Sequence, residues 1–347
     1  MRQRHMRKLI SRRAFTLVEM MVVITIILVI IGLTAGAYIR FIGSQRQSNT
    51  VLLLQKVSNA LNHHWQAVVD QAKNDTIPGG VLTWAGNDQE RARVLWIKLR
   101  LKYEFPMSRQ ELVNPWAGTT DPTYGNPFQD TTYPSPKLSY LRATSTEADA
   151  QKLDADGLMN LSPQQQSAVL LYLALSEKRR GVNFDPDKEL GDNEVATVTT
   201  QSPETGQTSV MKMIVDAWGN PVSFFRWPTG SQDPVNGGQV QNGLVDPQDP
   251  RGKLADKNWL SSTSGPQYYS ACVNVLHQIP APPPLGTSTT WPQSYQLVPV
   301  VASAGPDKVF ALTPSMELDT TNYTAQQAQG YAQDNIYSYD KRMGKGG

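Results

Sequence analysis

The chain has 347 residues, 39% hydrophobic and 18% charged, which is typical of a folded protein with room for a membrane segment and one large or two small domains. Its formal net charge is +2, but six basic residues lie within residues 1–14, so the remainder carries −4 and presents no basic surface for nucleic acid. Cys272 is the only cysteine, which excludes an internal disulfide and a thiolate metal cluster.

An apolar run near the N-terminus is the strongest pattern in the sequence. Residues 20–37 contain no charge and no proline, and a helix from Phe15 to Ile39 is long enough to cross a hydrocarbon layer of roughly 30 Å. The basic residues before it place the N-terminus in the cytoplasm and the bulk of the chain outside. A removed secretory signal peptide is the alternative, but its cleavage site follows the apolar run, whereas here that run leads into a long helical pattern.

Glu19 is the only acidic residue between Phe15 and Ile39. An unpaired carboxylate there costs on the order of a few kcal/mol, which makes it a candidate functional group with a partner. No Lys or Arg lies between Phe15 and Ile39, so a cationic partner has to come from cleavage of the chain or from another chain. The alternative is that Glu19 reaches the cytoplasmic headgroups.

The segment RRAFTLVEMMVV resembles the prepilin signal of type IV pilins and type II secretion pseudopilins. The resemblance implies that residues 1–14 are a leader, that a prepilin peptidase cuts between Ala14 and Phe15, and that Phe15 is then N-methylated. It also implies that Glu19 pairs with the Phe15 amine of a neighbouring subunit when a filament assembles. The family usually has Gly where this chain has Ala14.

The helical pattern continues beyond the apolar run. Apolar residues recur at spacings of three or four over residues 54–72, and the first proline is Pro78. We therefore expect one helix from about Phe15 to about Lys73. Its transmembrane half covers residues 15–39, and an amphipathic half, in residues 40–77, packs on a domain.

A variable insertion of helices and loops is predicted for residues 78–207. One helix is expected over Asp88–Tyr103, and another where Ser162 as N-cap and Gln165 form a capping box. The acidic loop at residues 185–194 lacks a Gly and a terminal Glu at the spacing that a calcium loop requires.

An antiparallel sheet with a C-terminal loop is predicted for residues 208–340, followed by a flexible tail, residues 341–347. Two hairpins are expected, one pairing SVMKMIV with PVSFFRW around DAWGN, the other pairing YQLVPVVA with KVFAL around SAGPD. The expected fold class is α+β and pilin-like, with a long N-terminal helix on a small antiparallel sheet and a helical insertion.

Three C-terminal segments extend the resemblance to the major pseudopilin of type II secretion. They are DAWGNP at residues 216–221, SAGPDK at residues 303–308 and DNI at residues 334–336. In that family the last two segments form a calcium-binding loop that locks the C-terminal region.

The resemblance implies calcium ligands at Asp307 and Asp334, with the Ser303 region supplying carbonyl oxygen. Hard oxygen donors of this kind suit Ca²⁺. Lys308 replaces the Gly of the family, and the stretch between the two acids is longer than in relatives. The alternative is that Asp307 belongs to a polar turn and that Asp334 is a surface acid.

The predicted function is that of a structural subunit of a type II secretion pseudopilus. The resemblance implies storage in the inner membrane as a single-pass protein, with the N-terminus cytoplasmic and the C-terminal domain periplasmic. Its implied partners are further copies in a filament, other pseudopilins, the prepilin peptidase and the inner-membrane assembly platform.

Two other functions remain open. One is a type IV pilus pilin for adhesion or DNA uptake, and the other, of a different class, is a membrane-anchored extracytoplasmic enzyme or binding module. The sequence has four His residues and one Cys, and it contains no nucleophile-elbow or phosphate-loop motif. These residues give no specific sign of catalysis, so we predict that the protein is not an enzyme.

Overall fold

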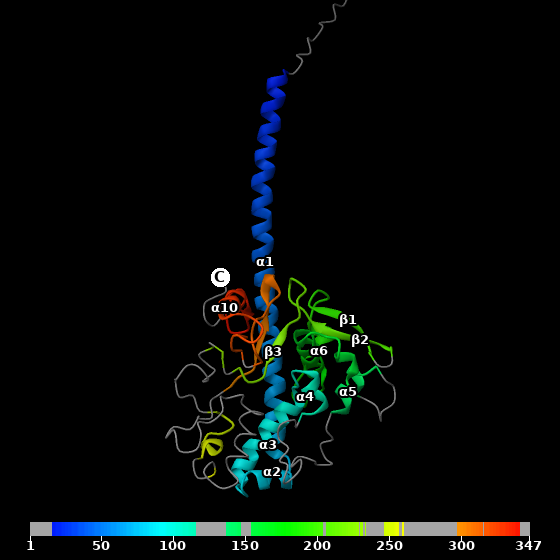
Figure 1. Ribbon diagram of the computed structural model, residues 1–347, viewed down its shortest axis with the longest axis vertical. Helices are drawn as coiled ribbons and strands as arrows, with labels where there is room; N and C mark the ends of the chain where they lie inside the picture. Colours follow the sequence, from blue (N-terminus) through cyan, green and yellow to red (C-terminus); the bar gives the residue numbers. More distant parts are fainter. Residues whose placement is uncertain are drawn as a thin grey trace, which may run out of the picture. The chain divides into compact units, whose positions relative to one another are not determined.

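The computed structural model describes residues 16–115, 137–146, 154–203, 206–228, 230, 231, 233, 246–256, 259, 297–314 and 316–340. The chain divides into two compact units, residues 1–47 and residues 48–347. Helix α1 (Leu17–Asn74) begins in the first unit and ends in the second (Figure 1).

The described part of the first unit is the apolar half of α1. Its large hydrophobic side chains are exposed, from Leu17 to Phe41. The hydroxyl groups of Thr25 and Thr34 donate to the carbonyls of Met21 and Ile30, at 2.8 and 2.9 Å, so both are satisfied inside their own helix. By length and composition this helix could cross a membrane, and it fits a membrane anchor.

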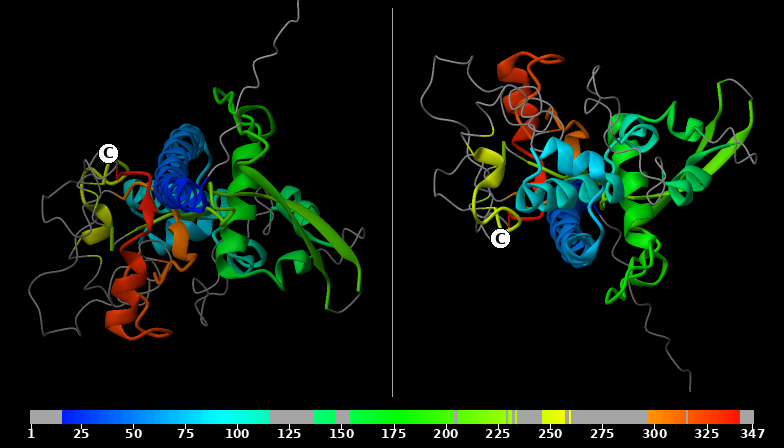
Figure 2. Two further views of the ribbon diagram at one scale, coloured as in Figure 1. Left: turned by 90° about the horizontal axis from the view of Figure 1, so that it is seen from above. Right: turned by 90° about the horizontal axis from the view of Figure 1, so that it is seen from below.

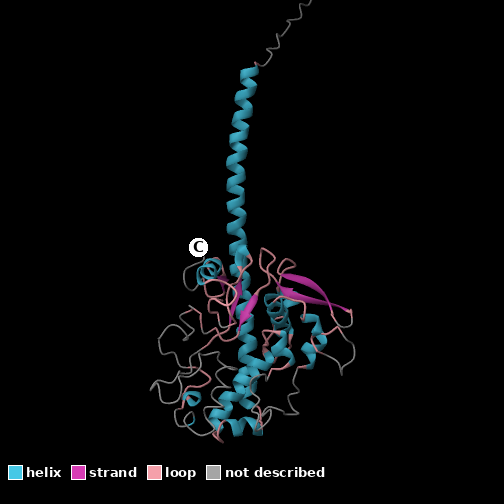
Figure 3. Ribbon diagram, in the orientation of Figure 1, coloured by secondary structure: helices cyan, strands magenta, loops and turns pink. Residues whose placement is uncertain are grey.

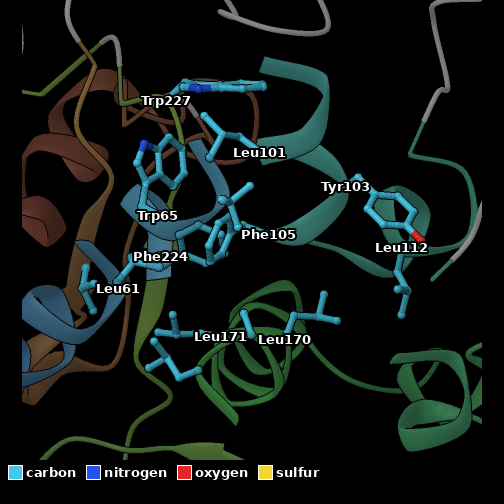
Figure 4. Packing of buried hydrophobic residues seen from close by; sticks show 14 of the residues in the cluster. Leu61, Trp65, Leu101, Tyr103, Phe105, Leu112, Leu170, Leu171, Phe224 and Trp227 are labelled. Atoms are coloured by element: carbon cyan, nitrogen blue, oxygen red, sulfur yellow. The ribbon is translucent and has the colours of Figure 1, made fainter. Parts of the chain in front are cut away.

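In the second unit α1 has one buried face. From Thr50 onward its apolar side chains join the main hydrophobic core at spacings of three and four residues. Trp65 stacks on Phe105 with ring centroids 5.3 Å apart, and Figure 4 shows Leu61 and Trp65 near Phe224 in the same core. Helix α1 therefore supplies one wall of this core.

Shorter helices complete the second unit among the described residues. They are α2 (Gly79–Trp84), α3 (Gln89–Glu104), α4 (Arg109–Val113), α5 (Leu138–Thr144), α6 (Pro163–Ser176), α7 (Pro186–Glu189) and α10 (Ala325–Ala332), with 3₁₀ turns η1 (Asp156–Leu158), η2 (Lys253–Ala255) and η4 (Gly305–Asp307). The predicted capping box of α6 is confirmed, because the Ser162 hydroxyl accepts from the Gln165 N–H and the Gln165 side chain accepts from the Ser162 N–H. Asp88 caps α3 by accepting from two N–H groups of its first turn.

Two small antiparallel sheets are present in the described residues. Strands β1 (Val195–Gln201) and β2 (Thr208–Ile214) form one, alongside α6 (Figure 2). The other has the order β3-β4-β5, with β3 (Ser223–Phe225), β4 (Val300–Ser303) and β5 (Ile336–Tyr337). Figure 3 shows the strands, in magenta, as a small part of a structure made mostly of helices and loops. The long N-terminal helix, the small antiparallel sheets and the added helices confirm the α+β class and are consistent with a pilin-like fold.

Both predicted hairpins are wrong. β2 pairs with β1, which lies inside the segment expected to hold helices and loops, and β2 meets the start of the next strand only through the bridge Val215–Pro221. Residues 308–312 form no ladder, and β4 pairs with β3 and β5 instead. Short β-prone runs specify an extended conformation but not a partner, which is decided by the faces that neighbouring helices bury. Here α6 packs on β2 and buries alternate residues of it.

Candidate functional site

Glu19 lies in the first turn of α1 and is hydrogen-bonded to Thr16. Its Oε2 accepts from the Thr16 backbone N–H at 2.8 Å and from the Thr16 hydroxyl at 3.0 Å. The Glu19 N–H in turn donates to Thr16 Oγ1 at 3.2 Å. This reciprocal pattern is a capping box, in which Thr16 is the N-cap and Glu19 the third helical residue. The charge of Glu19 alone does not predict this contact, but the Thr-x-x-Glu spacing of a capping box could have revealed Thr16.

Ala14 and Phe15, the residues at the predicted cleavage site, lie outside the described residues. The pairing of Glu19 with a Phe15 amine therefore stays a prediction. Oε1 of Glu19 accepts no hydrogen bond from any described residue, so this oxygen is available to a donor from another chain.

A second group of polar residues surrounds Asp216, which is 1% exposed at the end of β2. Its Oδ1 accepts from the N–H groups of Trp218 and Asn220, both at 2.8 Å, and its Oδ2 accepts from the Ser303 hydroxyl at 2.5 Å. Burying a carboxylate is costly unless it is fully hydrogen-bonded. These bonds meet that requirement and fix the turn at residues 216–220.

Further hydrogen bonds join this turn to other parts of the fold. The Asn220 side-chain amide donates to the Gly305 carbonyl at 2.7 Å, and the Gly305 N–H donates to Ser303 Oγ at 3.0 Å. The Ala217 N–H donates to Thr50 Oγ1 on α1 at 3.2 Å. We call the set Asp216, Asn220, Ser303, Gly305 and Asp334 the junction. It brings together the three C-terminal segments that resemble the major pseudopilin.

Gly305 makes the closest backbone approach in the junction. Its φ is +70°, and a Cβ atom there would lie 2.3 Å from the carbonyl oxygen of Asp334. Only glycine fits both the left-handed conformation and this approach. Glycine at position 305 therefore allows the first residue of η4 to pack directly against the backbone of Asp334.

The two predicted calcium ligands lie close together. The Asp307 N–H donates to Asp334 Oδ2 at 3.4 Å, and burial together with the charge of Asp307 raises the pKa of Asp334. Oδ1 of Asp334 is buried and accepts no hydrogen bond from the described residues. Two adjacent carboxylates with an unsatisfied oxygen are donors that a hard cation such as Ca²⁺ would satisfy.

The described residues would supply only part of a calcium shell. They hold no cluster of three or more His, Cys, Asp or Glu side chains, so backbone carbonyls or water would have to complete the six to eight oxygen ligands that Ca²⁺ takes. The Ser303 hydroxyl donates to Asp216, and the role of a carbonyl oxygen of the Ser303 region as a ligand stays a prediction. Lys308 adopts φ +69°, a left-handed conformation that Gly takes up without strain.

The acidic loop at residues 185–194 is structural. Asp185 caps α7, and Asp187 Oδ1 accepts from the Tyr172 hydroxyl at 2.5 Å and from Lys212 Nζ at 2.7 Å. Glu194 accepts from the Gly191 N–H at 2.8 Å. Cys272 lies outside the described residues.

Comparison with known proteins gives one match. Residues 10–35 match the family model described as the prokaryotic N-terminal methylation motif. No curated protein and no solved structure matches the chain. The matched residues include Glu19 and the predicted cleavage site, and the motif points to a structural subunit rather than an enzyme. On a helix apolar enough to cross a membrane, it supports a type IV pilin-like protein that a prepilin peptidase processes and that assembles into a filament.

Proposed function

We propose that the protein is a structural subunit of a type II secretion pseudopilus. It is stored in the inner membrane as a single-pass protein, with its N-terminus cytoplasmic and its C-terminal domain periplasmic. It is cut between Ala14 and Phe15, methylated at Phe15 and added to a periplasmic filament that drives protein export. The observation that carries this proposal is the methylation motif at residues 10–35 on the apolar helix α1.

The exposed apolar side chains of α1 support an assembly of many copies. A continuous apolar surface of this extent is costly in water and marks a contact with lipid or protein. Lipid covers it while the subunit is stored, and the helices of neighbouring copies and of other pseudopilins cover it in the filament. The prepilin peptidase and the inner-membrane assembly platform are the partners that act between these two states.

We propose that Glu19 selects the correct register between neighbouring subunits of the filament. Oε2 is held by Thr16, which orients the carboxylate, and Oε1 is open to a donor. The methylated Phe15 amine of the neighbouring subunit carries the opposite charge, and attraction between the two is strong in a site with little water.

The junction supports the pseudopilus over a type IV pilus. The segments that resemble the major pseudopilin, residues 216–221 and 303–308, are hydrogen-bonded to each other. A pilin of adhesion or DNA uptake remains the second candidate, because the N-terminal motif is common to both kinds of filament. Deleting the gene separates them: loss of protein export with pili intact is expected, and loss of pili with normal export would contradict the pseudopilus.

Mass spectrometry of the protein recovered from membranes tests the processing step. We expect a mature chain that starts at N-methylated Phe15. A chain that still starts at Met1, or one that starts beyond Ile39, would contradict the proposal.

Substitutions at Glu19 and Thr16 separate the charge of Glu19 from its capping role. Glu19→Gln keeps the capping box, since Gln serves at the third helical position, but removes the charge. We expect cleavage and insertion to be normal and filament assembly to be lost. Thr16→Ala removes the cap, keeps the charge and should still assemble. Normal filaments from Glu19→Gln, with none from Thr16→Ala, would show that capping and not the charge is what assembly needs.

We further propose that Asp307 and Asp334 bind Ca²⁺ in the periplasmic domain. The support is the hydrogen bond from the Asp307 N–H to the Asp334 carboxylate, the effect of the Asp307 charge on the pKa of Asp334, and Oδ1 of Asp334, which accepts no hydrogen bond from the described residues. When bound, the ion neutralises both acids and ties η4 to the residues that precede β5.

A further inference from the structure

A cavity of about 410 Å³ opens in the second unit, beside the first turns of α3. Its apolar walls are Ile77, which follows α1, Val94 on α3 and Pro250 in the loop before η2. This volume lies within the range of small ligand pockets, roughly 300–1,000 Å³.

Arg93 lines this cavity and carries a charge that the described residues do not balance. Its Nη1 donates to the carbonyls of Ala72 and Asp75, at 2.9 and 2.5 Å, near the C-terminal end of α1. No described carboxylate forms an ion pair with it. A guanidinium has five N–H donors, and no residue in the described part of the chain accepts from Nε or Nη2, so both can bind an acceptor in the cavity.

The other charged groups at the cavity already have partners. Arg251 pairs with Glu90, and Lys253 lies 3.5 Å from the same carboxylate. The Asp249 carboxylate accepts two backbone N–H groups of its own loop, and burial raises its pKa. The acids are therefore engaged, and the charge still available is the positive one of Arg93.

We propose that this cavity binds a peptide segment of a partner protein in which an acidic side chain adjoins an apolar one. The carboxylate pairs with Arg93 through the two nitrogens that are free, in the bidentate geometry that Arg favours. The apolar side chain packs between Ile77, Val94 and Pro250. This binding does not depend on the filament role.

Charge complementarity favours an acidic occupant and argues against the basic C-terminal residues of this chain. The last residues of this chain, 341–347, read KRMGKGG and are basic, so they do not match a cavity whose available charge is positive. An acidic peptide does match, and it approaches faster because the cationic side chains attract it.

Binding of two blocked, fluorescein-labelled peptides to the full-length protein in detergent micelles tests the proposal. The peptides are Gly-Leu-Asp-Leu-Gly and its Asn counterpart, and fluorescence anisotropy gives their dissociation constants. We expect the Asp peptide to bind about tenfold more tightly, with a difference that shrinks at high salt. Equal affinities would overturn the proposal.

Two variants and a control locate the binding. Arg93→Gln should abolish the preference for the Asp peptide, whereas Arg142→Gln, which removes an exposed charge on α5, should keep it. Gln89→Glu adds an acid to the rim of the cavity in the first turn of α3, where an acid is compatible with the helix, and should weaken the Asp peptide at least about fivefold. An Asp preference that survives both pocket variants would overturn the site. If deleting residues 341–347 strengthens peptide binding, the tail of the chain is the occupant and the assignment to a partner is wrong.

Discussion

Asp216 and Ser303 are 87 residues apart in the sequence, and a hydrogen bond of 2.5 Å joins the Ser303 hydroxyl to Asp216 Oδ2. Both side chains are buried. The bond joins the turn that follows β2 to the last residue of β4, and so connects the ends of strands from different sheets.

We expect Asp216→Ala to lower the free energy of unfolding by about 3 kcal/mol, because it leaves buried N–H and hydroxyl donors unsatisfied. Ser303→Ala should cost about 1–2 kcal/mol. The two changes share one bond, so the double variant should cost less than their sum by about 1 kcal/mol in urea denaturation. Full additivity would show that the bond contributes nothing of its own.

Gly305→Ala should destabilise the domain by more than about 3 kcal/mol, since it adds a steric clash with the Asp334 carbonyl to the strain of a positive φ. Gly181→Ala is the matched control. Gly181 has φ +81° and open space around the added methyl group, so only about 1 kcal/mol of backbone strain is expected. Equal losses of thermal stability in the two variants would argue against the close contact at residue 305.

Acid should destabilise the domain through two buried groups. Burial alone would raise the pKa of Glu104, but Lys137 and Arg179 attract the carboxylate and lower it to about 2, from an ordinary 4.5. Burial and the neighbouring Arg179, whose Nη1 lies 2.8 Å from His64 Nδ1, lower the pKa of His64 from 6.5 to about 4. In both cases the unfolded chain takes up its proton at a higher pH than the folded one.

Stability should therefore fall in two steps as the solution is acidified. The contribution of His64 is complete above about pH 6.5 and is lost down to about pH 4, and that of Glu104 is lost from about pH 4.5 to 2. His64→Gln should remove the first step, which amounts to a few kcal/mol, from urea denaturation measured across this pH range. His63→Gln, at the exposed neighbouring position, should leave it in place. If the loss of stability between about pH 6.5 and pH 4 is the same in both variants, a group other than His64 causes it.

Removal of calcium tests the acid pair. If Asp307 and Asp334 hold Ca²⁺, EDTA should lower the melting temperature of the wild-type protein by about 3–8 °C, and added Ca²⁺ should restore it. Asp334→Asn should abolish this response. Asp319→Asn changes a half-buried acid that accepts backbone N–H groups of Thr321 and Asn322, and it should retain the response. A melting curve that does not respond to EDTA would refute the calcium site.

The sequence predicted the elements whose signals are local. The limits of α1, Leu17 and Asn74, fall within two residues of the expected ones, because the apolar run and the periodic pattern after it continue without a proline. The capping box at Ser162 was also predictable from spacing. Strand pairing was not, because β1 and β2 find each other through packing on α6, which short β-prone runs do not encode.

The residues of the candidate sites were also predictable only where the signal was local in the sequence. Glu19 stands out as a lone acid in an apolar run, and the acids of the junction were named through a resemblance of short segments. The bond between Asp216 and Ser303 was missed because sequence spacing carries no information on side-chain contacts over such a distance. Arg93 was missed for a related reason: that no described carboxylate pairs with it can be seen only once its surroundings are known.

The junction also makes the finished polypeptide distinguishable from an incomplete one. Gly305 packs on the backbone of Asp334, so a chain that stops short of that residue lacks one wall of the structure around the buried Asp216. We expect such a chain to open more easily and to be more sensitive to proteases that act on unfolded segments. Complete synthesis of the chain, through residue 334, is therefore a condition for the full set of contacts around Asp216.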